Sequence, residues 1–327
     1  MGRHLFLLPL LALAISCGQP SQRVREPRPT VPTVPPRTDI VYPTVIIGRD
    51  GWLYLGEDLA RACRPTHGIV DTLARLRRLD RMVTESGRRL VLVVAPDKSS
   101  VIPEHLPEAY STDGCALRHR RDFWERFDAD PPVAVYVDLD ARFARLRSDA
   151  VYRKLDSHWT PQGAAIYAQE LATALDPRLW EGTRVVRTGT RELGGDLAQL
   201  LGRRTTEAVA EWEVVRPGVH GNFGNVALGA EPASILNRST GVALFPQRTL
   251  LLVDSFSLKQ VSGTAVFSLF EGAVALYSQA ARPQTIAREI AEAEVVVVEA
   301  AERYVVSGES SLLADETLVA IEAALRS

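Results

Sequence analysis

The stretch Leu250-Leu251-Leu252-Val253-Asp254-Ser255-Phe256-Ser257 decides the fold of this chain. Its first four residues are apolar, and a short unbroken apolar run that ends at polar residues predicts a strand buried on both faces. In an open α/β sheet, the carboxyl ends of such strands form the crevice where ligands bind. Asp254 and Ser255 are therefore expected at that crevice. The other interpretation is that they cap the next helix, since both residue types favour that position.

The chain after residue 44 alternates strand-like apolar runs with helical patterns. Further strands are expected at 90–95, 133–137, 266–270, 274–277 and 295–298, and helices at 71–86, 161–175, 283–293 and 311–325. Asp50-Gly51 predicts a hairpin turn between short strands at 45–48 and 52–55. Buried strands separated by helices predict an α/β fold, a three-layer α/β/α sandwich with a mainly parallel sheet. Residues 202–241 show no clear element and are interpreted as an insertion near the site.

The N-terminus has the features of an export signal. Leu5 to Ile15 form an apolar run too short to span a bilayer, and the run ends at Ala14-Ile15-Ser16-Cys17. This pattern resembles a bacterial lipoprotein signal over residues 1–17, in which Cys17 becomes the lipidated N-terminus. The alternative is an ordinary secretory signal. Both interpretations place the protein outside the cytoplasm, and the lipoprotein interpretation anchors it to a membrane, in the periplasm or at the cell surface.

Residues 18–43 are rich in proline and lack apolar periodicity, which predicts an extended tether before a domain at 44–327. Export also affects how the remaining cysteines are interpreted. Cys63 and Cys115 are the only pair left in an oxidising compartment, so we expect a disulfide between them, with two free buried thiols as the alternative.

The charge and motif content exclude several classes of protein. The formal net charge is −2, which offers no basic field for a nucleic-acid backbone. The histidines show no metal-ligand spacing and no glycine loop cradles a phosphate, so the sequence predicts neither a metal nor a cofactor.

A second motif, Asp156-Ser157-His158-Trp159-Thr160-Pro161, precedes the helix expected at 161–175. A carboxylate two residues from a histidine can fix the tautomer of the imidazole and stabilise its protonated form, as a general base requires. Alone, the motif more often marks a capping aspartate beside a surface histidine. Together with Ser255 it matches the pattern of a serine nucleophile, a base and an orienting acid.

These motifs resemble the SGNH hydrolases, and their order along the chain is similar to that of alginate O-acetyltransferases of the AlgJ/AlgX type. The Asp-x-His motif precedes the serine, a permuted block order for this fold. The resemblance is supported by four further segments: Gly48–Tyr54, Pro96–Pro103, the run from Asp156 to Gly163, and Gly195-Asp196-Leu197. Glu302 stands where the family usually carries asparagine, so the usual side-chain oxyanion donor is absent at that position.

The resemblance implies that Ser255 is the nucleophile, His158 the general base and Asp156 the orienting acid. It implies acetyl transfer to an extracytoplasmic polysaccharide, with a membrane acyltransferase as the partner that supplies the acetyl group. An acetylesterase would use the same three residues. A non-catalytic, membrane-anchored glycan-binding or scaffold protein is the alternative from a different class.

Three further residues are candidates for binding the substrate. Lys98 follows a predicted strand and is expected either to bind substrate or to be structural. Trp159 is expected to stack on a sugar or to pack against the sheet. Arg303 is expected to supply positive charge beside the serine or to pair with Glu299.

Overall fold

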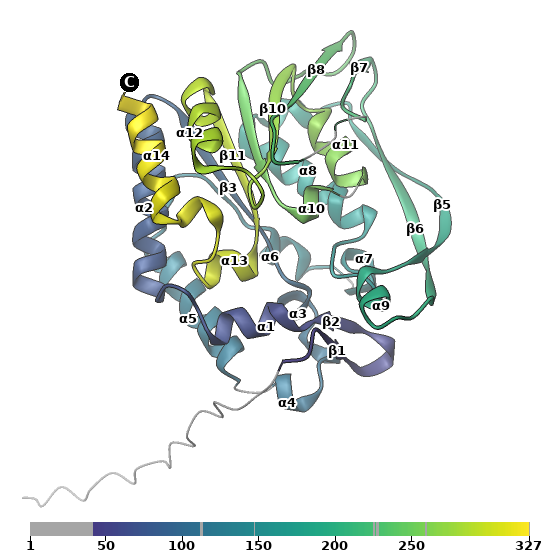
Figure 1. Ribbon diagram of the computed structural model, residues 1–327. Coiled ribbons are helices and arrows are strands. Elements are labelled where there is room, and N and C mark those ends of the chain that lie inside the picture. The colour runs from purple at the N-terminus through teal and green to yellow at the C-terminus, as the bar shows by residue number, and fades with distance from the viewer. Residues whose placement is uncertain are drawn as a thin grey trace, which may run out of the picture. The chain divides into compact units, whose positions relative to one another are not determined.

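The computed structural model describes residues 42–326, apart from 112, 113, 147, 225, 227, 228 and 259. Figure 1 shows how the elements in this part of the chain are arranged. The predicted lipidation site Cys17, the signal at 1–17 and the tether up to residue 41 lie outside the described residues. Within the described residues, no helix is both long enough and apolar enough to cross a membrane.

A seven-stranded sheet forms the centre of the described residues, in the order β4-β3-β11-β9-β10-β8-β7. Its strands are β3 (Arg89–Ala95), β4 (Tyr136–Val137), β7 (Val219–Gly221), β8 (Ala233–Ser239), β9 (Thr249–Val253), β10 (Gly272–Tyr277) and β11 (Val295–Ala301). The five strands from β4 to β10 in this order run parallel, while β8 is antiparallel to β10 and β7 to β8. The predicted mainly parallel sheet is confirmed, with all five residues of β9 buried.

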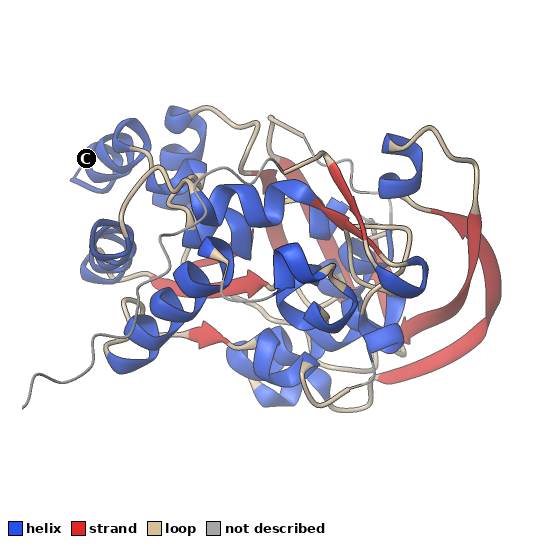
Figure 2. Cartoon of the chain, turned by 90° about the horizontal axis from the view of Figure 1, so that it is seen from below, coloured by secondary structure: helices blue, strands red, loops and turns tan. Residues whose placement is uncertain are grey.

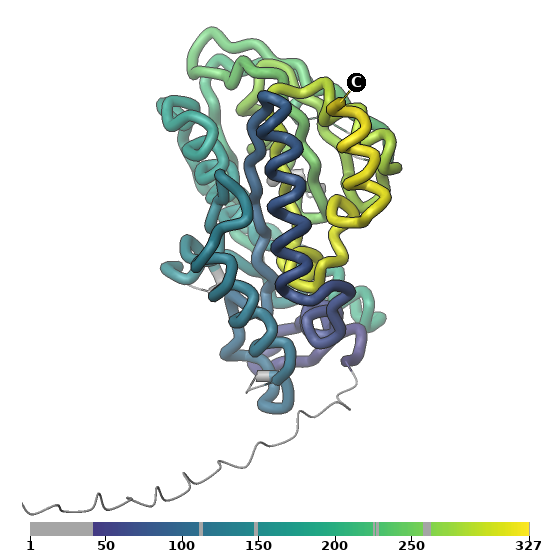
Figure 3. Tube along the Cα trace, turned by 90° about the vertical axis from the view of Figure 1, so that its left-hand side faces the viewer, coloured from purple at the N-terminus to yellow at the C-terminus, as the bar shows by residue number. Residues whose placement is uncertain are grey.

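Two groups of helices cover the sheet, and the predicted three-layer sandwich is confirmed (Figures 2 and 3). The first group is α2 (Ile69–Glu85), α12 (Pro283–Glu292) and α14 (Asp315–Arg326), and Figure 3 shows α2 and α14 side by side. The second group is α6 (Leu139–Phe143), α8 (Pro161–Leu175) and α11 (Gln260–Phe267). Helix α2 forms because its apolar residues recur at helical spacing and are buried as one stripe. These residues are Leu73, Leu76, Leu79 and Val83.

One expected strand is wrong. Residues 266–270 are not a strand: Val266 and Phe267 end α11, and a turn follows. Since β9 and β10 are parallel neighbours, the chain needs a crossover between them, which α10 (Ser255–Leu258) and α11 supply. A short apolar run fits a buried helix as well as a buried strand, so periodicity alone does not decide between them.

The region expected to be an insertion contains strands. β6 (Thr206–Val215) pairs with β5 (Arg184–Gly194) as a long antiparallel ribbon, while β7 and β8 extend the central sheet. The ribbon lies at the right of Figure 1, and α9 (Asp196–Leu200) falls between its two strands in the chain. Hereafter "the ribbon" means β5 and β6.

The predicted hairpin is confirmed: β1 (Val45–Ile47) pairs with β2 (Leu53–Leu55), and Asp50 and Gly51 have positive φ at its turn. The predicted disulfide also forms, and Cys63 joins Cys115 with Cα atoms 5.1 Å apart. It connects α1 (Gly56–Cys63) to α5 (Cys115–Ala129). The remaining elements are α3 (Lys98–Val101), α4 (Glu108–Ser111), α7 (Ser148–Val151), α13 (Glu302–Val306) and 3-10 turns at Arg49–Gly51, Pro103–His105, Pro177–Trp180 and Ser311–Leu313.

Candidate active site

Ser255 lies at the carboxyl end of β9, between β11 and β10, where the sequence predicts a crevice. The preceding residue, Asp254, holds this turn in place. One oxygen of its carboxylate accepts the backbone N–H of Phe256 at 2.8 Å, and the other accepts that of Ala301 at the end of β11. Ser255 is half-buried, and its hydroxyl has no hydrogen-bond partner among the described residues. The hydroxyl is therefore available to a ligand.

Glu299 supports the serine turn from within the sheet. Its Oε2 accepts the backbone N–H of Asp254 at 3.1 Å and the hydroxyl of Ser257 at 2.9 Å. Burial, together with the nearby charge of Asp254, raises the pKa of Glu299 well above its ordinary value.

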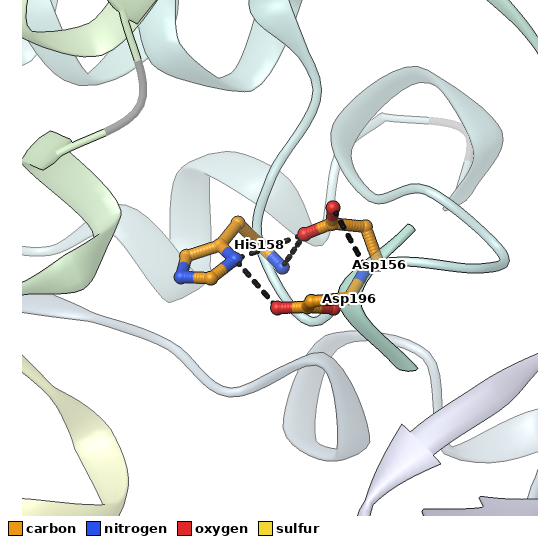
Figure 4. Close-up of side chains that lie close together, drawn as sticks. All are labelled: Asp156, His158 and Asp196. Atoms are coloured by element: carbon orange, nitrogen blue, oxygen red, sulfur yellow. Dashed lines mark hydrogen bonds and ion pairs between the residues drawn. The ribbon is translucent and has the colours of Figure 1, made fainter. Parts of the chain in front are cut away.

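The imidazole of His158 is held by the carboxylate of Asp156. Asp156 Oδ1 lies 2.9 Å from His158 Nδ1 and also accepts the backbone N–H of His158 at 3.0 Å (Figure 4). The ring of His158 packs edge-on against Phe256, with centroids 5.0 Å apart. Because Phe256 follows Ser255 directly, this contact brings the imidazole into the neighbourhood of the serine turn.

A second carboxylate contacts the same ring nitrogen. Asp196, the first residue of α9, places Oδ2 3.2 Å from His158 Nδ1, and Figure 4 shows both aspartates beside the ring. Its carboxylate also accepts the backbone N–H of Ser157 at 2.7 Å and the Ser157 hydroxyl at 2.6 Å. Asp196 belongs to the supporting motif Gly195-Asp196-Leu197, but the sequence predicts no role for it, because no local pattern shows that residue 196 returns to residue 158.

The electrostatics of Asp196 favour its ionised form. Burial opposes ionisation, but the hydrogen bonds from His158 and Ser157 outweigh it, and the pKa of Asp196 lies below its ordinary value. Asp156, His158 and Asp196 can each bring one ligand atom within 4.8 Å of the others, so this trio also has the donor types of a metal site. The hydrogen bonds just described orient the imidazole, as a general base requires.

The loop that carries Asp156 is clamped by the ribbon. Arg153 Nη1 lies 3.1 Å from Asp156 Oδ2, and Arg153 Nη2 donates to the carbonyl of Gly194 at 2.6 Å. From β6, Glu207 accepts the backbone N–H groups of Lys154 at 2.9 Å and Leu155 at 3.0 Å. The position of the Asp156 loop therefore depends on residues 41 to 53 positions further along the chain.

Lys98 has a buried environment that argues against substrate contact. Its side chain is 0% exposed, and its Nζ donates to the carbonyls of Arg153 at 2.8 Å and Lys154 at 3.3 Å. Burial lowers the pKa of Lys98 to about 7. Lys98 thus holds the loop that carries Asp156 from inside the protein. This position supports the interpretation of Lys98 as a structural residue.

Arg303 is also buried, and its ion-pair partner differs from the one expected. It pairs with Asp97 at 2.9 Å, and not with Glu299, because Glu299 faces the serine turn. Asp97, which is 0% exposed, pairs with Arg120 at 2.9 Å as well. We call Asp97, Arg120 and Arg303 the buried ion cluster. Asp97 and Arg303 lie just beyond the ends of β3 and β11, next to the end of β9, and Arg120 comes from α5.

Glu302, which replaces the family's asparagine, is also buried. It accepts hydrogen bonds from the backbone N–H of Asp97, from the Ser100 hydroxyl and from Trp124 Nε1. These bonds use its carboxylate to brace α3 and α5. Trp159 is 4% exposed and packs on Phe256 with ring centroids 4.7 Å apart, which favours the packing interpretation over sugar stacking.

Comparison with known proteins identifies the family. A family model described as "SGNH hydrolase-like domain, acetyltransferase AlgX" matches residues 45–218, more than half of the chain. This range includes Asp156, His158 and Asp196, while Ser255 follows it. The chain is 32% identical over 133 residues to the probable alginate O-acetylase AlgJ of Pseudomonas fluorescens. That match covers 41% of this chain and 34% of the relative, so the chain spans about a third of the length of the curated relatives it matches.

Solved structures show the same fold. The O-acetyltransferase domain of Pseudomonas putida AlgJ gives a TM-score of 0.55 at 20% identity and covers 85% of this chain and 98% of that one. Pseudomonas aeruginosa AlgX gives a TM-score of 0.54 at 20% identity, and the match covers 85% of this chain and 66% of that one. Because the family model matches more than half of this chain, the chain belongs to the SGNH hydrolase-like domain family of the acetyltransferase AlgX.

Proposed function

We propose that this protein is an extracytoplasmic O-acetyltransferase or acetylesterase that acts on the O-acetyl groups of a polysaccharide through Ser255, His158 and Asp156. The observation that carries the proposal is the imidazole of His158, oriented by Asp156 and packed beside the serine turn at a strand end. An acid-oriented base near an unpartnered serine hydroxyl suits nucleophilic acyl transfer. The AlgJ and AlgX names of the related proteins support acetyl as the acyl group.

The proposed reaction has two balanced steps. His158 Nε2 takes the proton of the Ser255 hydroxyl while Oγ bonds to the acetyl carbonyl carbon, and the leaving oxygen of the donor then receives that proton. In the second step an acceptor hydroxyl, from a sugar or from water, gives its proton to His158 while its oxygen bonds to the carbonyl carbon of the acetyl-serine. The bond from that carbon to Ser255 Oγ then breaks, and Oγ takes the proton back from His158. The backbone N–H of Ser255, at the start of α10, is the proposed donor to the oxyanion.

A chromogenic acetyl ester tests whether Ser255 is reactive. We expect Ser255→Ala to lower kcat by about 10³-fold or more, because the members of a triad act as a unit. Ser234→Ala, which changes an exposed serine on β8, is the matched control and should retain wild-type turnover. Mass spectrometry of the wild type after brief exposure to the ester should locate one acetyl group on Ser255. Absence of both turnover and labelling would instead support the non-catalytic glycan-binding or scaffold protein.

Transfer and hydrolysis are separated by an acceptor. With an acetyl ester as donor and an oligosaccharide as acceptor, a transferase yields acetylated oligosaccharide, whereas an esterase yields acetate at the same rate with and without the acceptor. Transfer in the cell would require an acetyl donor outside the cytoplasm, for which we propose a membrane acyltransferase as partner. Export and lipidation at Cys17 are part of the same proposal, and Cys17→Ala should release the protein from the membrane fraction.

A further inference from the structure

A small apolar cluster lies apart from the main core, where the hairpin of β1 and β2 packs against α9. Its buried members are Val45, Leu53, Leu197 and Ala198. The cluster borders the loop that carries Asp156, because the backbone N–H of Leu53 donates to the carbonyl of Lys154 at 2.9 Å. The surface around this cluster therefore adjoins the candidate active site.

Two large apolar side chains at the edge of this cluster are open to solvent. Ile47 is 54% exposed and Leu200 is 57% exposed. Ile47 pairs with Leu53 across the hairpin, and cross-strand partners share a face, so Ile47 lies on the hairpin face that packs against α9. Leu200 follows the buried Leu197 by three residues, which makes the two side chains neighbours on the surface of α9.

The end of α9 fixes two arginines beside these apolar side chains. Gly202 has a φ of +68°, a conformation that glycine adopts without strain, and its N–H donates to the carbonyl of Gln199 at 2.8 Å. The N–H of Arg203 donates to the carbonyl of Ala198 at 2.9 Å. These two bonds form a Schellman motif, which ends the helix. Arg203 and Arg204, both exposed, therefore follow directly on the leucines of α9.

The cations of this surface have no acidic partner among the described residues. The side chains of Arg203 and Arg204 form no hydrogen bond or ion pair there, and the exposed Lys154 donates to a backbone carbonyl, that of Asp50, at 3.0 Å. The carboxylate of Asp50 lies 3.1 Å from His105 Nδ1 instead. We call the exposed apolar and cationic side chains around the cluster the hairpin face: Ile47, Lys154, Leu200, Arg203 and Arg204.

We propose that the hairpin face docks on the surface of an anionic lipid bilayer. Apolar side chains enter the boundary between headgroups and acyl chains, while neighbouring cations attract anionic headgroups. The chain enters the described residues at Tyr42, just before β1, so the proposed lipid anchor at Cys17 connects to this end of the domain. A second copy of the chain is a poorer occupant, because a symmetric contact would bring the same unpaired cations together.

The tether expected at 18–43 decides how strong this contact must be. An extended, proline-rich segment would by itself let the domain stand away from the membrane in any orientation. Because the anchor holds the hairpin face at a high effective concentration near the bilayer, even a weak contact fixes the orientation of the domain. The docked orientation brings the loop that carries Asp156 close to the bilayer surface, since the hairpin holds that loop. The inference goes beyond the proposed chemistry and rests on the proposed anchor.

Quenching of a fluorescent label by brominated lipids tests the proposal, with the full lipidated chain in vesicles. One protein carries the label at Gln199→Cys, an exposed position of α9, and the other at Ser234→Cys, an exposed position of β8. Figure 1 shows β8 at the top and the hairpin at the bottom. In vesicles that contain phosphatidylglycerol, we expect quenching of the α9 label to exceed that of the β8 label about threefold. The difference should shrink in pure phosphatidylcholine and with added salt.

Substitutions identify the side chains responsible. Arg203→Gln combined with Arg204→Gln should lower quenching of the α9 label to that of the β8 label, because the attraction to the headgroups is lost. Leu200→Ser should act in the same direction by removing an apolar contact. Arg184→Gln combined with Arg187→Gln is the matched control. It removes the same charge from exposed positions in the first half of β5 and should leave quenching unchanged.

Three results would overturn the proposal: equal quenching of the two labels in anionic vesicles, equal quenching of the α9 label in neutral and anionic vesicles, or equal losses for the two arginine pairs. A dimer in detergent solution that Leu200→Ser dissociates would assign the hairpin face to a second copy. Flotation with vesicles separates these failures from failure of the anchor. A chain that floats with equally quenched labels has the anchor alone, and a chain that does not float has neither. Turnover of the chromogenic acetyl ester reports on Ser255 independently of both.

Discussion

The two halves of the candidate site are built in different ways. Ser255 follows a buried central strand, and its turn is fixed by neighbouring strand ends through Asp254, Glu299 and Ala301. His158 lies on a loop, and its position depends on Asp196 and on the ribbon. The serine half is thus fixed by the central sheet, whereas the histidine half is a buried loop segment held mainly by polar contacts with Asp196 and the ribbon. We therefore expect that removing contacts of the serine half will mainly reduce stability, and that removing contacts of the histidine half will mainly reduce activity.

The largest expected effect comes from the carboxylate closest to the base. Asp156→Asn should lower kcat on an acetyl ester by about 10⁴-fold, because the amide no longer fixes the required tautomer of His158. The fold should persist, as judged by circular dichroism and thermal unfolding. Retention of a tenth or more of wild-type kcat would remove Asp156 from the proposed triad.

The buried ion cluster tests the serine half through stability. Asp97→Ala leaves Arg120 and Arg303 buried without their shared carboxylate, and should cost about 3–5 kcal/mol in urea unfolding. Asp71→Ala is the control, because its partly exposed pair with Arg75 is expected to contribute about 1 kcal/mol or less. Equal losses for the two variants would contradict the idea that the cluster supports the ends of the strands.

The ribbon tests the histidine half through activity. Glu207→Gln weakens the acceptor for two backbone N–H groups of the Asp156 loop, and should lower kcat on the small ester by about tenfold, as expected for about 1.4 kcal/mol. Glu211→Gln, on the same strand and paired with Arg191, should leave kcat unchanged. If Glu207→Gln changes the midpoint of thermal unfolding but not kcat, the ribbon contributes to stability and not to activity. That result would contradict the distinction between the serine half and the histidine half.

Asp196 is expected to have the smallest effect. Asp196→Asn should lower kcat by only a few-fold, since Asp156 still orients the ring. Because the pKa of Asp196 is lower in the folded protein than in the unfolded chain, its ionised form stabilises the fold. This contribution is fully present above the unfolded value of about 4 and is lost as the pH falls through the folded value. Urea unfolding of the wild type and of Asp196→Asn from pH 7 to pH 2 should therefore show that the difference in their free energies of unfolding becomes smaller as the pH falls.

The sequence predicted the part of the site that depends on local patterns. An apolar run followed by polar residues indicates where β9 ends, and the Asp156-Ser157-His158 spacing is itself local. The strand expected at 266–270 is wrong because a short, mainly apolar run suits either a helix or a strand.

The rest of the site depends on contacts between distant segments, which no local pattern encodes. Neither the approach of Asp196 to His158 nor the pairing of Arg303 with Asp97 follows from spacing, since each pair is joined only by tertiary packing. The ribbon was missed for a related reason. Much of β5 and β6 is exposed, so their side chains do not show the buried apolar runs that marked the central strands.

The clamp on the Asp156 loop has a consequence for protein engineering. A short graft of residues 156–160 into another scaffold would carry Asp156 and His158 but few of the groups that hold them. Arg153 and Lys98 contact the loop, and residues 193–207 supply the carbonyls, the second carboxylate and the backbone acceptor. The smallest transplantable unit is therefore discontinuous, because residues 153–160, residues 193–207 and Lys98 must be moved together.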